Sequence, residues 1–359
     1  MAKSNKKGII AMIVGASMGS LTTFAVSSQM AIYDKMFPRF DRPDYSITPN
    51  KIDYQMLKDR FPRKTIRYKS GNVHLQGYYY EAKNPKGIVV VCHGLRSGAD
   101  DYIPISKFFV DNGFNVFSFD NRGTYDSEGD STVGMCQSLV DLDNTLKYLS
   151  KTEPYKDFPL FLVGHSWGGY AVTSVLCCKT KITACASISA MHSGYQIIYE
   201  KGKQYAGKLA APSKLFLNIY QKLLFNKYTN YDGIKGINES NIPVLVAHGI
   251  DDEVIAFDKQ SIYAHKDRIT NKNVEFYIGK GITGKHTSIW HSVDCLLYKE
   301  EVKSELKFLE MKKGDKLTYE EKQEFYRTID RDLYNEINYE LFFRILDMFN
   351  LALKPRIKG

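Results

Sequence analysis

One stretch decides the fold that this sequence predicts, and it reads Leu160-Phe161-Leu162-Val163-Gly164-His165-Ser166-Trp167-Gly168-Gly169. Its first four residues form an apolar run, which is typical of a strand buried on both faces of a parallel sheet. An apolar helical pattern follows over residues 167–178, so Ser166 is expected on a sharp strand-to-helix turn. Glycine at 164 and 168 would let the neighbouring backbones approach closely. This G-x-S-x-G pattern makes Ser166 the candidate nucleophile, and the helix N-terminus beneath it favours developing negative charge.

Predicted strands and helices alternate on both sides of this stretch. A hairpin is expected over residues 65–80, with Gly71 in its turn. Apolar runs then predict strands at 87–92, 115–119, 182–189, 242–247 and 274–278, and helical spacing predicts helices at 101–113, 135–149 and 257–269. Such alternation indicates an α/β domain with a mainly parallel central sheet, helices on both faces and right-handed crossovers.

A serine nucleophile needs a base, and the base needs a carboxylate that orients it. Where a serine lies on such a turn, the acid and then the base follow it along the chain. The predicted strand at 242–247 leads into Asp251 and Asp252, and we favour Asp252 because its Asp-x-Val register suits the loop. His286 lies in the loop after the last predicted strand and is the expected base, with His291 as the alternative.

The tetrahedral intermediate of acyl transfer needs two backbone N–H donors. The strand at 87–92 ends in His93-Gly94-Leu95, which places the Leu95 N–H next to the expected nucleophile. The Trp167 N–H is the second predicted donor of this oxyanion hole. His93 is interpreted as a structural residue that braces the loop.

Together these motifs resemble the α/β-hydrolase superfamily, and within it the serine-aminopeptidase-like and monoacylglycerol-lipase-like branch. The resemblance covers about residues 65–300 and includes the turn at 120–129, which reads Asp-Asn-Arg-Gly-Thr-Tyr-Asp-Ser-Glu-Gly. It implies hydrolysis of an ester, thioester or amide through an acyl-enzyme, without a metal or cofactor. An esterase or lipase acting on a lipid-like or acylated substrate is the first hypothesis. A peptidase, an acyl-protein thioesterase and a non-catalytic binding protein of the same fold are the alternatives.

Composition places few further limits on function. The chain has 359 residues, of which 43% are hydrophobic and 25% charged, and its formal net charge is +9. The basic residues are scattered among acidic ones, so we interpret the excess as a solvated surface and predict no nucleic-acid partner. None of the six cysteines forms a C-x-x-C pair or has zinc spacing, and most lie in apolar runs. They are interpreted as small buried hydrophobic residues.

The N-terminus carries the second prediction about function. Residues 8–33 lack charged side chains, follow Lys3, Lys6 and Lys7, and are long enough to span a bilayer core of about 30 Å. We predict a tail and single-pass signal anchor over residues 1–34, with a cleaved signal peptide or a buried soluble helix as alternatives. The three lysines favour a cytoplasmic N-terminus and an extracytoplasmic catalytic domain, although basic residues beyond the segment oppose this bias.

The rest of the chain is divided by composition. Residues 35–64 are rich in proline and charge and are predicted as a linker. Residues 65–193 and 242–356 are predicted to form the α/β-hydrolase core, and 194–241 a helical insertion placed where a lid would lie. The apolar stripe on the last helix is expected to pack on the sheet; it comprises Leu341, Phe342, Ile345, Leu346 and Phe349.

Overall fold

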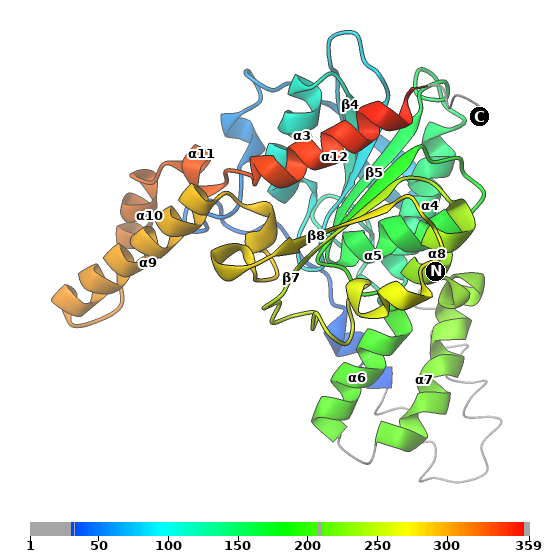
Figure 1. Ribbon diagram of the computed structural model, residues 1–359. Coiled ribbons are helices and arrows are strands. Elements are labelled where there is room, and N and C mark those ends of the chain that lie inside the picture. Colours follow the sequence, from blue (N-terminus) through cyan, green and yellow to red (C-terminus); the bar gives the residue numbers. More distant parts are fainter. Residues whose placement is uncertain (1–29, 32, 207–209, 355–359) are drawn as a thin grey trace.

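The computed structural model describes residues 30–31, 33–206 and 210–354. Its centre is an eight-stranded sheet with the order β1-β2-β4-β3-β5-β6-β7-β8 (Figure 1). The strands are β1 (Lys64–Ser70), β2 (Val73–Tyr80), β3 (Ile88–Cys92), β4 (Asn115–Phe119), β5 (Leu160–His165), β6 (Ala184–Ile188), β7 (Val244–Gly249) and β8 (Val274–Gly279). The β1–β2 and β2–β4 pairs are antiparallel and all other pairs are parallel, which confirms the predicted mainly parallel sheet.

Helices cover both faces of the sheet, as the alternating pattern predicts (Figure 1). On one face, α3 (Ile103–Asp111) and α12 (Tyr339–Ala352) share a buried apolar cluster with the strands. On the other face, α4 (Gln137–Leu149), α5 (Trp167–Ser174) and α8 (Gly233–Ser240) contribute to a second cluster. All five apolar residues of the α12 stripe are buried, so the prediction that this helix packs on the sheet is confirmed.

One predicted helix is wrong. Residues 257–269 hold only a short 3-10 helix, η6 (Tyr263–Arg268), after a series of turns. The chain is drawn out of helical geometry because Ser261 forms an isolated β-bridge with Met191, and the Gln260 carbonyl accepts the His192 N–H at 3.0 Å. A contact with the β6–α6 connection, distant in sequence, thus overrides the local helical spacing.

The segment between β6 and β7 contains α6 (Gly194–Ala206) and α7 (Ala210–Phe225) ahead of α8, within the predicted insertion at 194–241. Figure 1 shows α6 and α7 extending away from the sheet. Helical residues 33–36 lie against α7, where the rings of Tyr33 and Tyr220 meet edge to face at 5.4 Å. The Tyr220 hydroxyl also donates to Asp34 at 3.1 Å. The N-terminal end of the described chain therefore packs at the base of this insertion.

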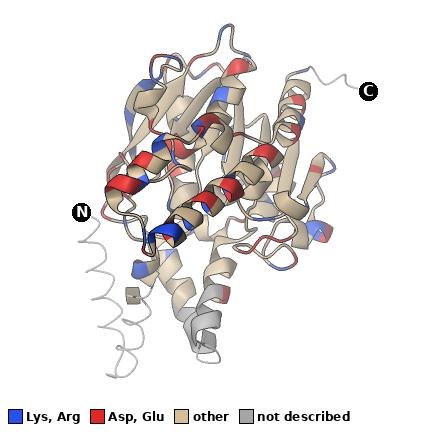
Figure 2. Cartoon of the chain, turned by 90° about the vertical axis from the view of Figure 1, so that its left-hand side faces the viewer, with Lys and Arg blue, Asp and Glu red and all other residues tan. Residues whose placement is uncertain are grey.

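A second group of helices, here called the arm (residues 293–334), projects from another side of the molecule, at the left of Figure 1. It consists of α9 (Val293–Lys313), α10 (Tyr319–Arg327) and α11 (Arg331–Tyr334). Val302, Phe325 and Ile329 form a small buried cluster inside it, separate from the two sheet clusters. Acidic and basic side chains alternate along its surface (Figure 2). The range predicted as core, 242–356, therefore includes a charged helical projection.

The predicted membrane segment lies almost wholly outside the described residues. Among the helices in the described ranges, none combines the length and the apolar character needed to cross a bilayer. The anchor over residues 1–34 therefore stays a prediction from the sequence.

Candidate active site

Ser166 lies directly after β5, on the turn into α5. Its backbone has φ 56° and ψ −112°, a conformation that costs energy for any residue other than glycine. The turn is also crowded, because a Cβ atom at Gly168 would lie 2.1 Å from the carbonyl oxygen of Cys92. A Cβ atom at Gly164 would lie 2.3 Å from the Gly168 carbonyl oxygen. Only glycine fits at either position, and the strained turn raises the Ser166 side chain above the carboxyl edge of the sheet.

The structure brings Ser166, His286 and Asp252 together in one line of hydrogen bonds. The Ser166 Oγ lies 2.9 Å from Nε2 of His286, and Nδ1 of the same ring lies 2.8 Å from Oδ2 of Asp252. A carboxylate at Nδ1 keeps the proton on that nitrogen, which leaves Nε2 able to accept the serine proton. His286 and Asp252 are both buried, so solvent screens their interaction weakly.

Asp252 receives hydrogen bonds on both oxygens. Its Oδ1 accepts the N–H groups of Val254 at 2.9 Å and Ile255 at 2.8 Å, while Oδ2 faces His286 and also Nε2 of His248 at 3.1 Å. Burial by itself would raise the pKa of Asp252, but the hydrogen bonds from His248 and His286 outweigh it and hold the pKa well below its usual range. The carboxylate is therefore charged at neutral pH.

The alternative acid and base lie elsewhere. Asp251 is exposed, and its backbone N–H donates to the Gly284 carbonyl oxygen. His291 is buried behind the site, with Nε2 2.9 Å from Nζ of Lys299 and Nδ1 3.2 Å from the Glu336 carbonyl oxygen. The geometry therefore favours Asp252 and His286 over these alternatives.

Two side chains support the His286 backbone. The Ser189 hydroxyl donates to the His286 carbonyl oxygen at 2.9 Å, and Nε2 of His165 lies 3.2 Å from the same oxygen. The other ring nitrogen of His165 meets the Tyr102 hydroxyl at 2.8 Å. Burial, followed by repulsion from His286, lowers the pKa of His165 to about 3. His165 is thus neutral and supports the site without competing for its proton.

The predicted oxyanion donors flank Ser166 from two elements. Trp167 is the first residue of α5, and its indole Nε1 is held by the Met135 carbonyl oxygen at 2.7 Å. Leu95 belongs to the segment between β3 and α3, here called the candidate oxyanion loop (residues 93–102). A Cβ atom at Gly94 would lie 3.5 Å from the Cβ atom of Ser166, so this loop passes directly beside the serine. Within the described residues, neither the Leu95 nor the Trp167 N–H has an acceptor.

His93 braces the start of this loop, as the sequence suggests. Its Nδ1 lies 2.7 Å from the Gly94 carbonyl oxygen, and Nε2 accepts the Asn121 N–H at 2.9 Å. Burial lowers the pKa of His93 to about 4, so the ring stays neutral and can accept at Nε2.

Three residues that contact the site were not predicted from the sequence: His248, Tyr102 and Ser189. His248 could have been suspected, because it lies in the last part of β7, four residues before Asp252. Tyr102 and Ser189 carry no local signal, since their contacts with His165 and with the His286 carbonyl oxygen span 63 and 97 residues. Across the ranges that the structure describes, no group of three or more His, Cys, Asp or Glu side chains could hold a metal ion.

Comparisons with known proteins give matches in sequence and in structure. A family model described as serine aminopeptidase, S33, matches residues 83–233. The uncharacterized protein YfhR of Salmonella typhimurium is 27% identical over 207 residues, which cover 56% of this chain and 68% of that protein. Human monoglyceride lipase is 28% identical over 123 residues, which cover 34% of this chain and 38% of the lipase. The Pyrococcus furiosus esterase Pf2001 matches in structure with a TM-score of 0.53 and 20% identity, over 77% of this chain and 98% of the esterase.

These matches confirm the predicted resemblance to the α/β-hydrolase superfamily and to its serine-aminopeptidase-like and monoacylglycerol-lipase-like branch. The structural match establishes the fold, and the sequence matches support a hydrolase.

Proposed function

We propose, from this resemblance and from the hydrogen-bonded side chains of Ser166, His286 and Asp252, that the protein is a serine hydrolase that cleaves carboxylic esters. The observation that carries the proposal is the unbroken line from Ser166 Oγ to His286 Nε2 at 2.9 Å and from His286 Nδ1 to Asp252 at 2.8 Å. The strained turn at Ser166 adds to it, because such strain persists where a function selects it.

Each residue has a chemical role in this mechanism. His286 removes the hydroxyl proton of Ser166 while the serine oxygen attacks the substrate carbonyl, and the Asp252 carboxylate stabilises the resulting imidazolium. The N–H groups of Leu95 and Trp167 donate to the oxyanion of the tetrahedral intermediate. His286 then protonates the leaving alcohol, and an acyl-enzyme forms on Ser166. A water molecule, activated by the same histidine, releases the acid and restores the serine.

A lipid-like or acylated ester is the proposed substrate. The match to monoglyceride lipase supports an acyl glycerol type of ester, and the predicted anchor would hold the enzyme at a bilayer. The helical insertion at 194–241 is proposed to act as a lid on the acyl-binding side. A peptidase or acyl-protein thioesterase is the second candidate. The serine-aminopeptidase family model favours the peptidase of these two.

Covalent labelling tests the nucleophile. A fluorophosphonate probe should modify the folded wild-type protein at Ser166, and the Ser166→Ala variant should stay unlabelled and lose at least about 10⁴-fold in ester turnover. A heat-denatured sample and a known serine hydrolase serve as controls. If the folded protein stays unlabelled while the control enzyme reacts, the protein is a binding protein that has kept the fold.

A substrate panel then separates the enzyme candidates. Equal concentrations of a monoacylglycerol, an acylated peptide thioester and an aminoacyl amide are offered to the wild type and to Ser166→Ala. Serine-dependent turnover should be fastest on the monoacylglycerol. Faster release from the amide or the thioester would identify the second candidate.

We also propose that residues 1–34 anchor the protein and that the catalytic domain lies on the extracytoplasmic side. Removal of residues 1–34 should move the protein from sedimented membranes to the supernatant. Protease added to intact spheroplasts should degrade the catalytic domain of the full-length protein. Continued sedimentation of the shortened chain would refute the anchor, and full protection from protease would place the domain on the cytoplasmic side.

A further inference from the structure

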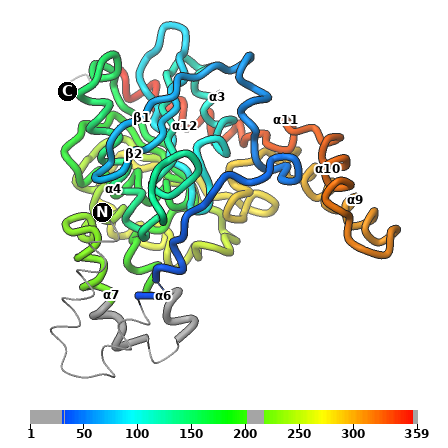
Figure 3. The backbone as a smooth tube through the Cα atoms, turned by 180° about the vertical axis from the view of Figure 1, so that it is seen from behind, coloured from blue at the N-terminus to red at the C-terminus, as the bar shows by residue number. Residues whose placement is uncertain are grey.

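The predicted linker is packed against the body of the molecule. Its central part, here called the strap (residues 39–63), runs from the region of α6 to the base of the arm, where Figure 3 draws it in dark blue. The contacts at its far end are specific: Arg331 donates to the carbonyl oxygens of Tyr45 at 2.9 Å and Lys51 at 3.3 Å. The strap therefore follows a defined path over the surface.

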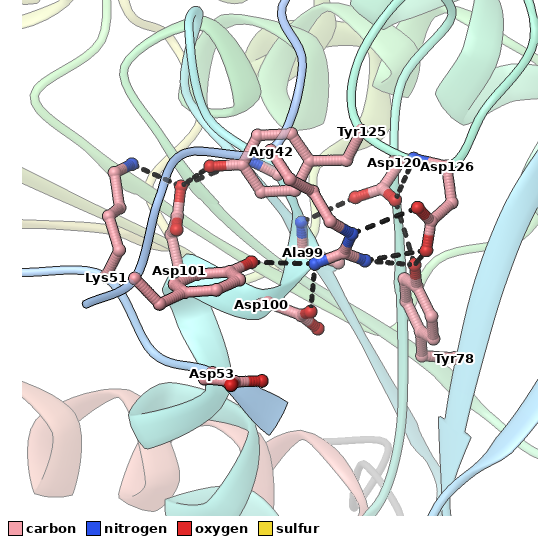
Figure 4. Close-up of polar contacts among 12 residues, drawn as sticks. Arg42, Lys51, Asp53, Tyr78, Ala99, Asp100, Asp101, Asp120, Tyr125 and Asp126 are labelled. Carbon is pink, nitrogen blue, oxygen red and sulfur yellow. Dashed lines mark hydrogen bonds and ion pairs between the residues drawn. The ribbon is translucent and has the colours of Figure 1, made fainter. Parts of the chain in front are cut away.

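Three cations of the strap pair with carboxylates of the candidate oxyanion loop and of the segment after β4. Figure 4 shows two of these cations, Arg42 and Lys51. Arg42 pairs with Asp100 at 2.5 Å and with Asp126 at 2.7 Å. Arg63 pairs with the other oxygen of Asp100, and Lys51 pairs with Asp101. The side chains of Asp100 and Asp101 are only 2% and 5% exposed, so their ion pairs lie largely out of solvent, whereas Asp126 is 47% exposed.

The side chain of Arg63 is fixed on several sides. Its guanidinium carbon lies 3.6 Å from the ring centre of Tyr54 and 3.8 Å from that of Tyr78, and Nη1 donates to the Tyr80 hydroxyl at 3.0 Å. Stacking of this kind suits the planar, weakly hydrated guanidinium. The strap is thus held by stacking and hydrogen bonds on Arg63 as well as by charge attraction.

Asp101 also fixes the backbone of the candidate oxyanion loop, to which it belongs. The Asp101 Oδ2 atom accepts the Gly98 N–H at 3.1 Å and the Ser97 hydroxyl. The neighbouring Tyr102 hydroxyl accepts the Gly94 N–H at 3.0 Å. Leu95, the proposed oxyanion donor, therefore lies between two points that are fixed by Asp101 and Tyr102.

Without the strap cations, four aspartate carboxylates would lie close together in this region. Asp100, Asp101, Asp120 and Asp126 meet there, and the Ala99 N–H donates to Asp120 at 2.8 Å. Burial, together with the nearby Asp100, raises the pKa of Asp120 to about 7 even though the Ala99 N–H opposes the shift. The cations of the strap supply the positive charge that lets the other carboxylates stay close together.

We propose that the strap positions the oxyanion hole, with Lys51 and Arg42 as positioning residues that hold the Leu95 N–H through Asp101 and Asp100. This inference rests on the proposed function, because it assigns a role in the same hydrolysis. It gives the segment between the predicted anchor and the catalytic domain a direct effect on the rate of the chemical step.

The test compares an ester with its thiono analogue in the full-length protein. p-Nitrophenyl butyrate places oxygen in the oxyanion hole, while the thiono ester places sulfur there, which accepts hydrogen bonds poorly. Lys51→Met and Arg42→Met should lower kcat for the oxygen ester about 10-fold or more while KM changes less than about twofold. The ratio of oxygen-ester to thiono-ester turnover should fall together with kcat for the oxygen ester. Partial unfolding would instead lower both rates equally and leave this ratio unchanged.

Two further variants complete the design. Lys51→Arg keeps the charge and should restore most of the ratio. Lys58→Met removes the same charge from an exposed position of the strap and should match the wild type in kcat and ratio. If the Lys51→Met and Lys58→Met ratios are equal while the wild type turns over ester, the strap proposal is overturned and the proposed function stands. If the folded wild type hydrolyses neither ester, both fall.

Discussion

The two groups of buried charge beside Ser166 are built in different ways. Ser166, Asp252 and His286 each follow one strand of the parallel sheet, namely β5, β7 and β8, so the sheet brings them to one edge. The carboxylates under the strap follow β3 and β4, but their cations come from a segment without strands. Arg42 and Asp100 are 58 residues apart, and Lys51 and Asp101 are 50 apart.

Two aspartates show the consequence of this difference. Asp252 accepts backbone N–H groups and two histidine rings, and its pKa is held low against the effect of burial. Asp120 is buried beside another carboxylate, and its pKa is raised to about 7. The first arrangement keeps a full charge ready to stabilise an imidazolium. In the second arrangement, the carboxylates can be charged only where the strap cations balance them, which suits a structural role.

Replacement of Asp252, the proposed acid, should have the largest effect in this comparison. Asp252→Asn would keep the shape of the side chain but remove the charge and the tautomer preference at His286, so kcat should fall by about 10³- to 10⁴-fold. Turnover of p-nitrophenyl butyrate measures it. Asp251→Asn is the matched control on the neighbouring exposed position, and its kcat should stay within about twofold of the wild type. Loss of activity in the Asp251 variant alone would reverse the assignment.

Removal of the strap cation Arg63 should lower the stability of the fold. Arg63→Met would leave the buried Asp100 with one cation partner, and we expect the free energy of unfolding to fall by about 3 kcal/mol. Urea unfolding followed by circular dichroism measures the change. Arg60→Met, on an exposed neighbouring position, should change it by less than about 0.5 kcal/mol. Equal stability of the two variants would mean that the strap contacts contribute little.

The pH dependence of stability should have opposite signs for His93 and Asp120. The pKa of His93 is about 4 in the fold and about 6.5 when unfolded. The unfolded chain therefore binds more protons between these values, and the stabilisation from neutral His93 is complete above pH 6.5 and lost as pH falls towards 4. Asp120 acts oppositely, because its raised pKa makes stability fall as pH rises from about 4 to 7.

A single substitution isolates the histidine contribution. His93→Gln should flatten the rise of unfolding free energy between pH 5 and 6.5 by at most about 1.4 kcal/mol per pH unit. Urea unfolding at a series of pH values measures the slope. The same slope in both proteins would show that His93 takes up its proton in the fold as easily as in the unfolded chain.

The smallest effect is expected where the strap meets the arm. The Tyr319 hydroxyl donates to Asp44 on the exposed surface, so Tyr319→Phe should shift the melting temperature by about 1 °C or less. Arg331→Met removes two hydrogen bonds to strap carbonyl oxygens and should lower it by about 3 °C or more. A larger shift for Tyr319→Phe would show that the arm stabilises the strap through this outer contact.

Much of the fold was predictable because its signals are local. The apolar runs of β3, β5 and β7 place these strands, since a strand covered on both faces must be apolar throughout. The helix predicted over 257–269 failed because Ser261 pairs with Met191, a contact that helical spacing cannot reveal. The candidate site was predictable because each of its three residues lies in the turn or loop that follows a strand.

The sequence by itself determined the α/β architecture and nominated Ser166, Asp252 and His286, because each sits in a short pattern next to a strand and the strands share one edge. Only the tertiary structure revealed that His248 also faces Asp252 and that residues 39–63 form a strap paired with Asp100 and Asp101. The physical reason is the range of the interaction. Propensity and hydrophobic spacing act within a few residues, whereas an ion pair between loops depends on where the whole chain brings its charges.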